Sequence, residues 1–177
     1  MRVIAGAWGG RTLKAPAGRA TRPTSDRVRE AIFSILGDIG GLRVLDLFAG
    51  SGALGIEALS RGAAHVVFVE ASWRTAGVIR ANLHAVGDPP AEIRVEDALR
   101  HLTVASGRAT YDLVFADPPY SSATHLGESL SQLLPGVLHE GSLTVTESDK
   151  RTPLALDLPL VDERTYGDTR IAIHRGR

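Results

Sequence analysis

The residues that most clearly point to chemistry are Asp117-Pro118-Pro119-Tyr120, which directly follow the apolar run 111–116. Two consecutive prolines stiffen a loop and hold the residue before them in an extended conformation. In such a loop, the Asp117 carboxylate and the Pro118 carbonyl can each accept one N–H of a planar amine, and the Tyr120 ring can stack on a base. The motif therefore predicts an amino group positioned for attack on an electrophile, with Asp117, Pro118 and Tyr120 as catalytic residues.

A second candidate site is the glycine-rich segment 50–55, which follows a strand expected over residues 42–47. Glycines there let the backbone approach a ligand closely. Glu70 ends the next strand, where a carboxylate can accept ribose hydroxyls, and Asp97 follows the third strand, where it can bond an adenine amino group. The predicted cofactor-binding residues are Asp46, Phe48, Gly50, Ser51, Gly52, Glu70, Ala71, Asp97 and Ala98.

The glycine segment alone fits a nicotinamide dinucleotide and S-adenosylmethionine equally well. Asp46 lies four residues before Gly50, which gives the pattern D-x-F-x-G-x-G of methyltransferase loops. The chain after residue 147 is too short for a separate dehydrogenase substrate domain. These two features favour S-adenosylmethionine, whose sulfonium methyl is already a strong electrophile. Both motifs also have a purely structural interpretation. The glycine segment would be an ordinary turn, and Asp117-Pro118-Pro119 would be a turn in which Asp117 caps the next helix.

Both motifs must be positioned by a parallel sheet, because strands and helices alternate from residue 42 onward. We expect strands over 42–47, 66–70, 93–95, 111–116 and 142–147, and helices over 53–61, 73–86, 98–105 and 123–134. Strands near 160–165 and 169–174 form a terminal hairpin. This pattern predicts an α/β, Rossmann-like fold of the class I methyltransferase type. Its mostly parallel seven-stranded sheet has helices on both faces and one antiparallel strand inserted near an edge.

The N-terminal region is strongly basic, although the formal net charge of the chain is zero. The first 30 residues contain seven Lys or Arg and two acidic residues. We expect a hairpin over 2–14, a linker over 15–23, and a helix capped by Thr24 or Ser25 that runs to about Leu36. This pattern favours a basic arm, residues 1–22, that grips a polyanion beside a methyltransferase domain, residues 23–177.

The arm residues predicted to bind RNA are Arg2, Trp8, Arg11, Lys14, Arg19 and Arg22. Their cationic side chains would contact phosphates, which position a protein without reading sequence. Trp8 either stacks on a base or closes the hairpin core. The alternative interpretation of the whole arm is a solvated, partly flexible tail.

The composition excludes several other classes of site. There is no cysteine, so disulfides and thiolate metal sites are excluded, and the six histidines show no zinc-ligand spacing, so we expect no metal. No apolar run approaches the ~20 residues of a membrane span, and residues 1–6 show no signal-peptide pattern. We therefore expect a cytoplasmic, monomeric protein without a membrane partner.

Taken together, the motifs resemble the bacterial 16S rRNA (guanine(966)-N2)-methyltransferase family. The resemblance covers essentially the whole chain and rests on Arg2-Val-Ile-Ala-Gly6 with Trp8-x-Gly-Arg-x-Leu13, on 22–33 (RPTSDRVREAIF), on 47–62 (LFAGSGALGIEALSRG), on Asp117-Pro-Pro-Tyr120 and on Tyr166-Gly-Asp-Thr169. It implies methyl transfer from S-adenosylmethionine to the N2 amine of one guanine in 16S rRNA, in the 30S subunit. Gly9 departs from the pattern, which has an arginine there.

Two other functions stay open at this point. A DNA adenine-N6 methyltransferase shares Asp-Pro-Pro-Tyr, but such enzymes usually carry a target-recognition insertion, for which 177 residues leave no room. A non-catalytic RNA-binding assembly factor could keep the same scaffold. The presence of Asp46, Glu70, Asp97 and Asp117 argues against that function.

Overall fold

The computed structural model describes residues 1–16, 25–119 and 123–177. Its centre is a seven-stranded sheet in the order β3-β2-β1-β4-β5-β7-β6. The strands are β1 (Arg43–Leu47), β2 (His65–Val69), β3 (Ala91–Arg94), β4 (Tyr111–Ala116), β5 (Leu138–Asp149), β6 (Leu160–Tyr166) and β7 (Thr169–Arg175). The helices are α1 (Asp26–Leu36), α2 (Ala53–Ser60), α3 (Trp73–Ala85), α4 (Ala98–Ala105) and α5 (Ala123–Leu133).

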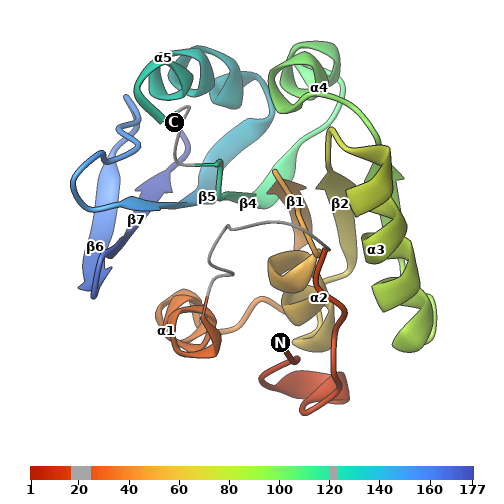
Figure 1. Ribbon diagram of the computed structural model, residues 1–177. Coiled ribbons are helices and arrows are strands. Elements are labelled where there is room, and N and C mark those ends of the chain that lie inside the picture. Colours follow the sequence, from red (N-terminus) through yellow and green to blue (C-terminus); the bar gives the residue numbers. More distant parts are fainter. Residues whose placement is uncertain (17–24, 120–122) are drawn as a thin grey trace.

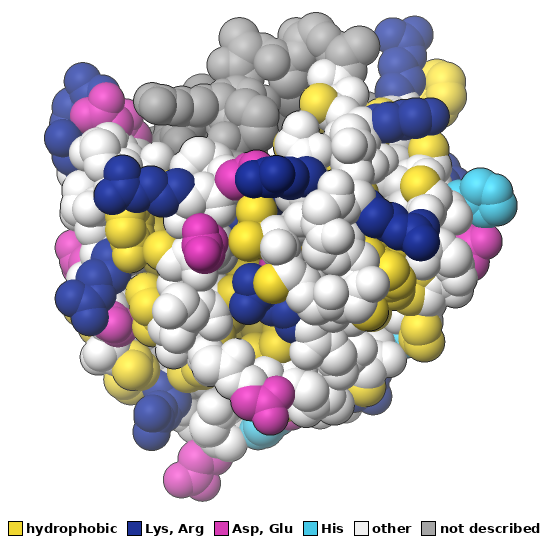
Figure 2. Space-filling model, turned by 90° about the horizontal axis from the view of Figure 1, so that it is seen from below, with side chains coloured by type: hydrophobic (Ala, Val, Ile, Leu, Met, Phe, Trp, Pro, Cys, Tyr) yellow, Lys and Arg dark blue, Asp and Glu magenta, His cyan; other side chains and the backbone are white. Residues whose placement is uncertain are grey.

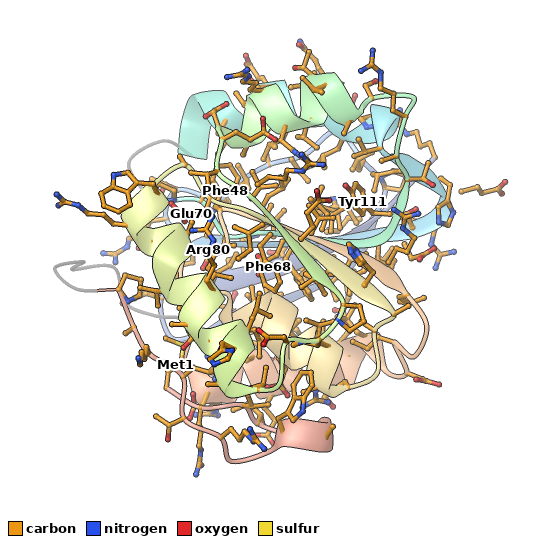
Figure 3. The ribbon with its side chains drawn as sticks, turned by 90° about the vertical axis from the view of Figure 1, so that its right-hand side faces the viewer. Met1, Phe48, Phe68, Glu70, Arg80 and Tyr111 are labelled. Carbon is orange, nitrogen blue, oxygen red and sulfur yellow. The ribbon has the colours of Figure 1, made fainter. Side chains whose placement is uncertain are left out.

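Helices cover both faces of the sheet, with α4 and α5 above it and α1 and α2 below it in Figure 1. Alternating strand residues point to opposite faces. In β1, Val44 belongs to the core cluster shared with α1, α2 and α3, whereas Leu45 and Leu47 belong to the cluster shared with α4 and α5. Figure 3 shows Phe68 and Tyr111 directed into these two layers from β2 and β4.

The strand directions confirm the predicted fold class. β1 to β5 run parallel, and β7 lies antiparallel between β5 and β6. Because the chain order reverses between β1 and β4, their carboxyl ends open a crevice, which is where ligands bind in sheets of this kind. The sheet therefore brings the glycine loop after β1 and the Asp117 loop after β4 side by side.

Two predicted elements differ from the structure. β5 is longer than the expected 142–147 because Leu138 already pairs with Tyr111, before a register shift in the β4–β5 ladder. The expected hairpin over 2–14 is reduced to one antiparallel bridge between Arg2 and Thr12, and a 3-10 helix (Gly6–Trp8) lies inside it. The expected α1 cap is confirmed at Ser25, whose hydroxyl accepts the Val28 N–H at 3.2 Å.

Residues 1–16 are docked on the domain through buried polar groups of α2 and α3. The Glu57 carboxylate accepts the N–H groups of Ile4 and Ala5 at 2.7 and 3.0 Å. Asn82 exchanges hydrogen bonds with the backbone of Lys14, at 2.8 and 3.0 Å. Val3 and Leu13 belong to the same core cluster as the helices below the sheet. This part of the chain is therefore continuous with the core of the domain.

Candidate active site

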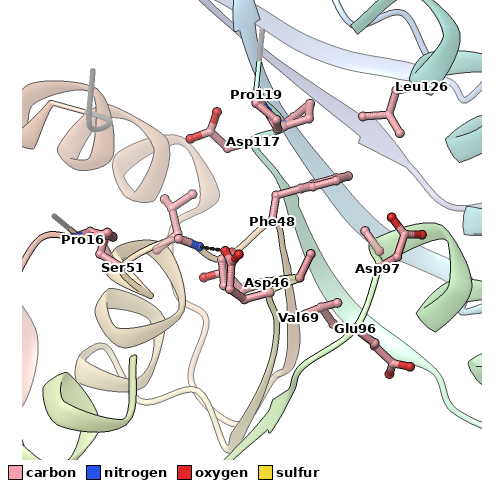
Figure 4. Close-up of a pocket in the computed structure, with 18 of the residues that line it drawn as sticks. Pro16, Asp46, Phe48, Ser51, Val69, Glu96, Asp97, Asp117, Pro119 and Leu126 are labelled. Atoms are coloured by element: carbon pink, nitrogen blue, oxygen red, sulfur yellow. Dashed lines mark hydrogen bonds between the residues drawn. The ribbon is translucent and has the colours of Figure 1, made fainter. Parts of the chain in front are cut away.

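A pocket of about 430 Å³ lies at the carboxyl ends of β1, β2 and β4. Its polar lining comes mainly from the loops that follow these strands and from the start of α4. Figure 4 shows Asp117 and Pro119 at one end of the pocket, Phe48 across its middle, and Glu96 and Asp97 on another side. The lining residues are Met1, Ala15, Pro16, Arg29, Asp46, Phe48, Ala49, Gly50, Ser51, Ala53, Leu54, Val69, Glu70, Ala71, Glu96, Asp97, Ala98, Leu99, Asp117, Pro118, Pro119 and Leu126.

Asp46 holds the glycine loop against the start of α2. Its side chain is 2% exposed, and one oxygen accepts the Gly55 N–H at 2.9 Å. Burial raises the pKa of Asp46 well above its usual value, and the nearby carboxylates of Asp117 and Glu70 raise it further, against the effect of the Gly55 hydrogen bond. A bound cation would relieve the crowding of negative charge at this point.

Glu70 joins the loop after β1 to the loop after β2. One carboxylate oxygen accepts the Gly50 N–H at 3.0 Å, and the other accepts the Ser72 N–H at 2.9 Å. Each carboxylate oxygen has a second lone pair, so Glu70 can still accept two further hydrogen bonds. Its position at the end of β2 and its two remaining acceptor sites suit the vicinal hydroxyls of a ribose.

The loop between β1 and α2 is shaped by left-handed backbone conformations. Phe48, Gly50 and Gly52 have φ values of 61°, 57° and 78°. For a bulky residue such as Phe48 this conformation costs about 1–2 kcal/mol, and it is maintained because neighbouring contacts fix the loop. The Ala49 N–H donates to the Val69 carbonyl at 2.9 Å, and the Asn82 amide donates to the Ser51 carbonyl at 2.9 Å. The result places the Phe48 side chain in the pocket lining.

Asp97 is the N-cap of α4. A single oxygen, Oδ1, accepts the N–H groups of Leu99 and Arg100, both at 3.0 Å. Its second oxygen takes no part in this cap, so it can serve the predicted contact with an adenine amino group. The adjacent Glu96 carboxylate, just before the helix, is 2.9 Å from Nδ1 of His101 in α4. Asp97 is therefore fixed in place by the helix that it starts.

The Asp117 loop borders the same pocket at the end of β4. Pro118 is buried, Asp117 is half-buried, and both lie in the lining together with Pro119. Tyr120, the third predicted catalytic residue, lies outside the described residues. An amine placed between Asp117 and the glycine loop would meet acceptors on one side and the cofactor crevice on the other.

The charge of the pocket separates the two cofactors that the glycine loop alone leaves equal. Besides the buried Asp46, four carboxylates line it, from Glu70, Glu96, Asp97 and Asp117, and Arg29 is the only Lys or Arg among the described lining residues. Such a field attracts a cation and repels the two phosphates of a dinucleotide. The residues present therefore fit a nucleoside that carries a sulfonium, as S-adenosylmethionine does.

All nine predicted cofactor-binding residues lie at this crevice, although the pocket lining does not include Gly52, which is buried beneath the loop as the N-cap of α2. Arg29 was not among the predicted site residues; its side chain is 1% exposed and donates to the Arg2 carbonyl at 2.5 Å and to Asp26 at 2.8 Å. Burial lowers the pKa of Arg29, against the opposing charge of Asp26. Its place on the apolar face of α1, three residues before Ile32, is the signal that could have revealed it. Glu96, directly before Asp97, is a further lining residue that the prediction omitted.

Among the described residues predicted to bind RNA, Arg2 and Arg11 contact different helices. Arg2 is exposed and lies 3.5 Å from Asp26, whereas Arg11 donates to the Ala85 carbonyl at 2.6 Å at the far end of α3. The Lys14 side chain is exposed, and Trp8 is half-buried against the core. Arg19 and Arg22 lie outside the described residues. Figure 2 shows Lys and Arg side chains spread across the face seen from below.

Residues 1–16, 25–119 and 123–177 offer neither a metal site nor a membrane-spanning helix. They hold no group of three or more His, Cys, Asp or Glu side chains able to bind a metal ion. Their helices are all too short or too polar to cross a membrane.

Comparison with known proteins gives consistent matches over the whole chain. A family model described as conserved hypothetical protein 95 matches residues 1–175. YlbH of Bacillus subtilis, provisionally named an rRNA methyltransferase, is 41% identical over 100% of both chains. Ribosomal RNA small subunit methyltransferase D of Haemophilus influenzae is 36% identical over 94% of this chain and 89% of its own. The solved structure of yhhF from Escherichia coli, provisionally named a methyltransferase, superimposes with a TM-score of 0.85 at 34% identity, covering 99% of this chain and 98% of its own.

Proposed function

The chain belongs to the family described as conserved hypothetical protein 95, together with the ribosomal RNA small subunit methyltransferases D, and on this premise we propose that it methylates 16S rRNA. The methyl donor is S-adenosylmethionine, and the acceptor is the exocyclic N2 amine of guanine 966, in the 30S subunit. The observation that carries the proposal is the meeting of a carboxylate-lined nucleoside pocket with the Asp117-Pro118 acceptor pair at one crevice.

The pocket residues divide into two tasks. Glu70 binds the ribose hydroxyls and Asp97 the adenine amino group, while the combined field of the carboxylates favours the positive sulfonium. When bound, the donor supplies an electrophilic methyl carbon whose bond to sulfur breaks as the new bond to nitrogen forms. The sulfonium loses its positive charge in that step. A negative field that stabilised the bound donor too strongly would therefore raise the barrier to methyl transfer.

Asp117 and Pro118 orient the amine. The Asp117 carboxylate and the Pro118 carbonyl each accept one N–H, which turns the nitrogen lone pair toward the methyl carbon for in-line attack. Positioning of two reactants in this way can supply about 7–11 kcal/mol of the barrier in favourable cases. The proton that the nitrogen loses on methylation leaves through the Asp117 carboxylate, the base that contacts it.

The substrate must present an unpaired guanine, because a base inside a duplex cannot reach a pocket between strand-end loops. Arg2, Arg11 and Lys14 are proposed to contact phosphates, as are Arg19 and Arg22 from the segment outside the described residues. Such contacts fix the register of the enzyme on the RNA, whereas the pocket itself recognises only the flipped base.

The test is transfer of labelled methyl groups to unmethylated 30S subunits, naked 16S rRNA and duplex DNA, with the product nucleoside identified by mass. The proposal predicts N2-methylguanosine at position 966 from ribosomal substrates and no product from DNA. N6-methyladenine in DNA would make the chain a DNA methyltransferase. Cofactor binding without any product would favour a non-catalytic assembly factor.

A further inference from the structure

The outer face of α3 presents an aromatic ring and cations beside the mouth of the pocket. Trp73, Gly77, Arg80 and His84 are exposed at the spacing i, i+4, i+7 and i+11, so they lie on one face of the helix. Arg74 is exposed beside them. The sequence of α3 contains no Asp or Glu, although His84 is paired at 2.9 Å with Asp88, which lies just beyond the helix.

Trp73 is unusually open for its size, with 70% of its surface exposed. The Arg74 guanidinium lies 5.6 Å from the centroid of the indole ring and covers one face, as in a cation–π contact. The other face is open to a ligand. Trp73 is the first residue of α3, two positions after Ala71, which lines the pocket. The open ring therefore lies close in the chain to Ala71, which is among the predicted cofactor-binding residues.

The cations beside this ring are available for a polyanion. Within residues 1–16, 25–119 and 123–177, no ion pair engages Arg74 or Arg80. At the far end of the helix, Arg11 donates to the Ala85 carbonyl at 2.6 Å, and Asn82 fixes the backbone of Lys14.

We propose that the Trp73–Arg74–Arg80 face of α3 binds an unpaired segment of the RNA substrate, with one base stacked on Trp73 and phosphates on the arginines. The proposal rests on the proposed function and adds a substrate-binding surface to it. A methyltransferase that extracts one base must also hold its unstacked neighbours, and an aromatic ring among arginines is the surface that does so. An acidic peptide would use the cations but would gain little from the open ring.

The test measures the affinity of a 16S rRNA transcript for the full chain in the presence of S-adenosylhomocysteine. Trp73→Ala is expected to weaken RNA binding about 5- to 150-fold, the usual range for loss of one stacked base. Trp73→Phe, which keeps an aromatic face, should stay within about threefold of the wild type. Arg80→Ser should weaken RNA binding. It should also reduce the slope of log affinity against log salt concentration by about 0.7, the value for one lost phosphate contact on a single strand. Arg164→Ser, an exposed arginine paired with Asp162 on β6, is the matched control and should change neither.

Each remaining outcome has a definite meaning. If Trp73→Ala binds RNA as the wild type does while methylation of rRNA persists, the α3 proposal fails and the proposed function stands. A loss of S-adenosylmethionine affinity in Trp73→Ala would assign the ring to the cofactor site instead. If polyglutamate displaces the bound transcript as effectively as single-stranded RNA does, the α3 face binds an acidic polypeptide and the RNA proposal fails. A wild-type chain that binds and methylates no RNA would overturn both proposals.

Discussion

Replacing Glu70 by glutamine is expected to weaken S-adenosylmethionine binding about 30- to 1,000-fold. Both carboxylate oxygens already accept backbone N–H groups, from Gly50 at 3.0 Å and Ser72 at 2.9 Å, and each has one lone pair left for a ribose hydroxyl. The amide nitrogen of glutamine would face one of these N–H donors and could accept no ribose hydroxyl. Hydrogen bonds to charged groups contribute about 1.5–3 kcal/mol each, so loss of one and weakening of the other amounts to about 2–4 kcal/mol.

Isothermal titration calorimetry with S-adenosylmethionine and S-adenosylhomocysteine measures this change. Both ligands should weaken, because the ribose is common to them. Glu92→Gln is the matched control, since Glu92 lies on β3 and pairs with the exposed Arg94 at 2.6 Å, outside the pocket. If a folded Glu70→Gln variant binds the donor within threefold of the wild type, Glu70 does not hold the ribose and the assignment of the pocket is wrong.

Three further predictions concern stability and RNA binding. Glu57→Ala leaves the N–H groups of Ile4 and Ala5 and the Arg61 side chain without their carboxylate, so urea unfolding should show a loss of about 3–5 kcal/mol, against under ~1 kcal/mol for Glu92→Ala, whose side chain is half-buried and paired with Arg94. An equal loss of unfolding free energy in both variants would show that the buried Glu57 does not anchor the N-terminal segment. Burial lowers the pKa of His174 below its ordinary 6.5, so its contribution to stability is complete above that pH and is lost as the pH falls toward the folded-state pKa. Unfolding at pH 7.5 and 5.5 should therefore show a smaller drop for His174→Asn than for the wild type; a parallel drop would remove His174 as a cause. Finally, Arg11→Ser with Lys14→Ser should lower the logarithmic salt slope of RNA binding by about 1.4, or 0.7 for each lost phosphate contact, and an unchanged slope would exclude the segment from RNA binding.

Elements whose ends are marked by local chemistry were predicted well from the sequence. α4 and β4 have the expected bounds, because Asp97 caps the helix and an apolar run defines the strand before Asp117. The start of α3 at Trp73 also agrees with the expected helix over 73–86, because the Ser72 hydroxyl accepts the Thr75 N–H and caps it. In each case the deciding contact joins residues only a few positions apart.

Features that depend on distant contacts could not be predicted. The N-terminal segment is held by Glu57 and Asn82, which lie more than 50 residues away in sequence, and these contacts replace the expected regular hairpin. The extension of β5 to Leu138 depends on pairing with β4 after a register shift. The spacing of Arg29 from Ile32 marks it as buried, but only the packing of α1 beside the crevice, a contact between distant parts of the chain, brings it into the pocket lining.

The central claim is that Asp117 positions the amine while other residues hold the donor. The most direct test compares Asp117→Ala with the wild type in single-turnover methyl transfer to 16S rRNA and in S-adenosylmethionine affinity. We expect transfer to fall by at least about 10²-fold, since a misplaced amine loses the benefit of in-line geometry, while donor affinity changes little. Retained transfer, or an equal loss of donor affinity, would contradict the claim and make Asp117 a structural residue of the loop.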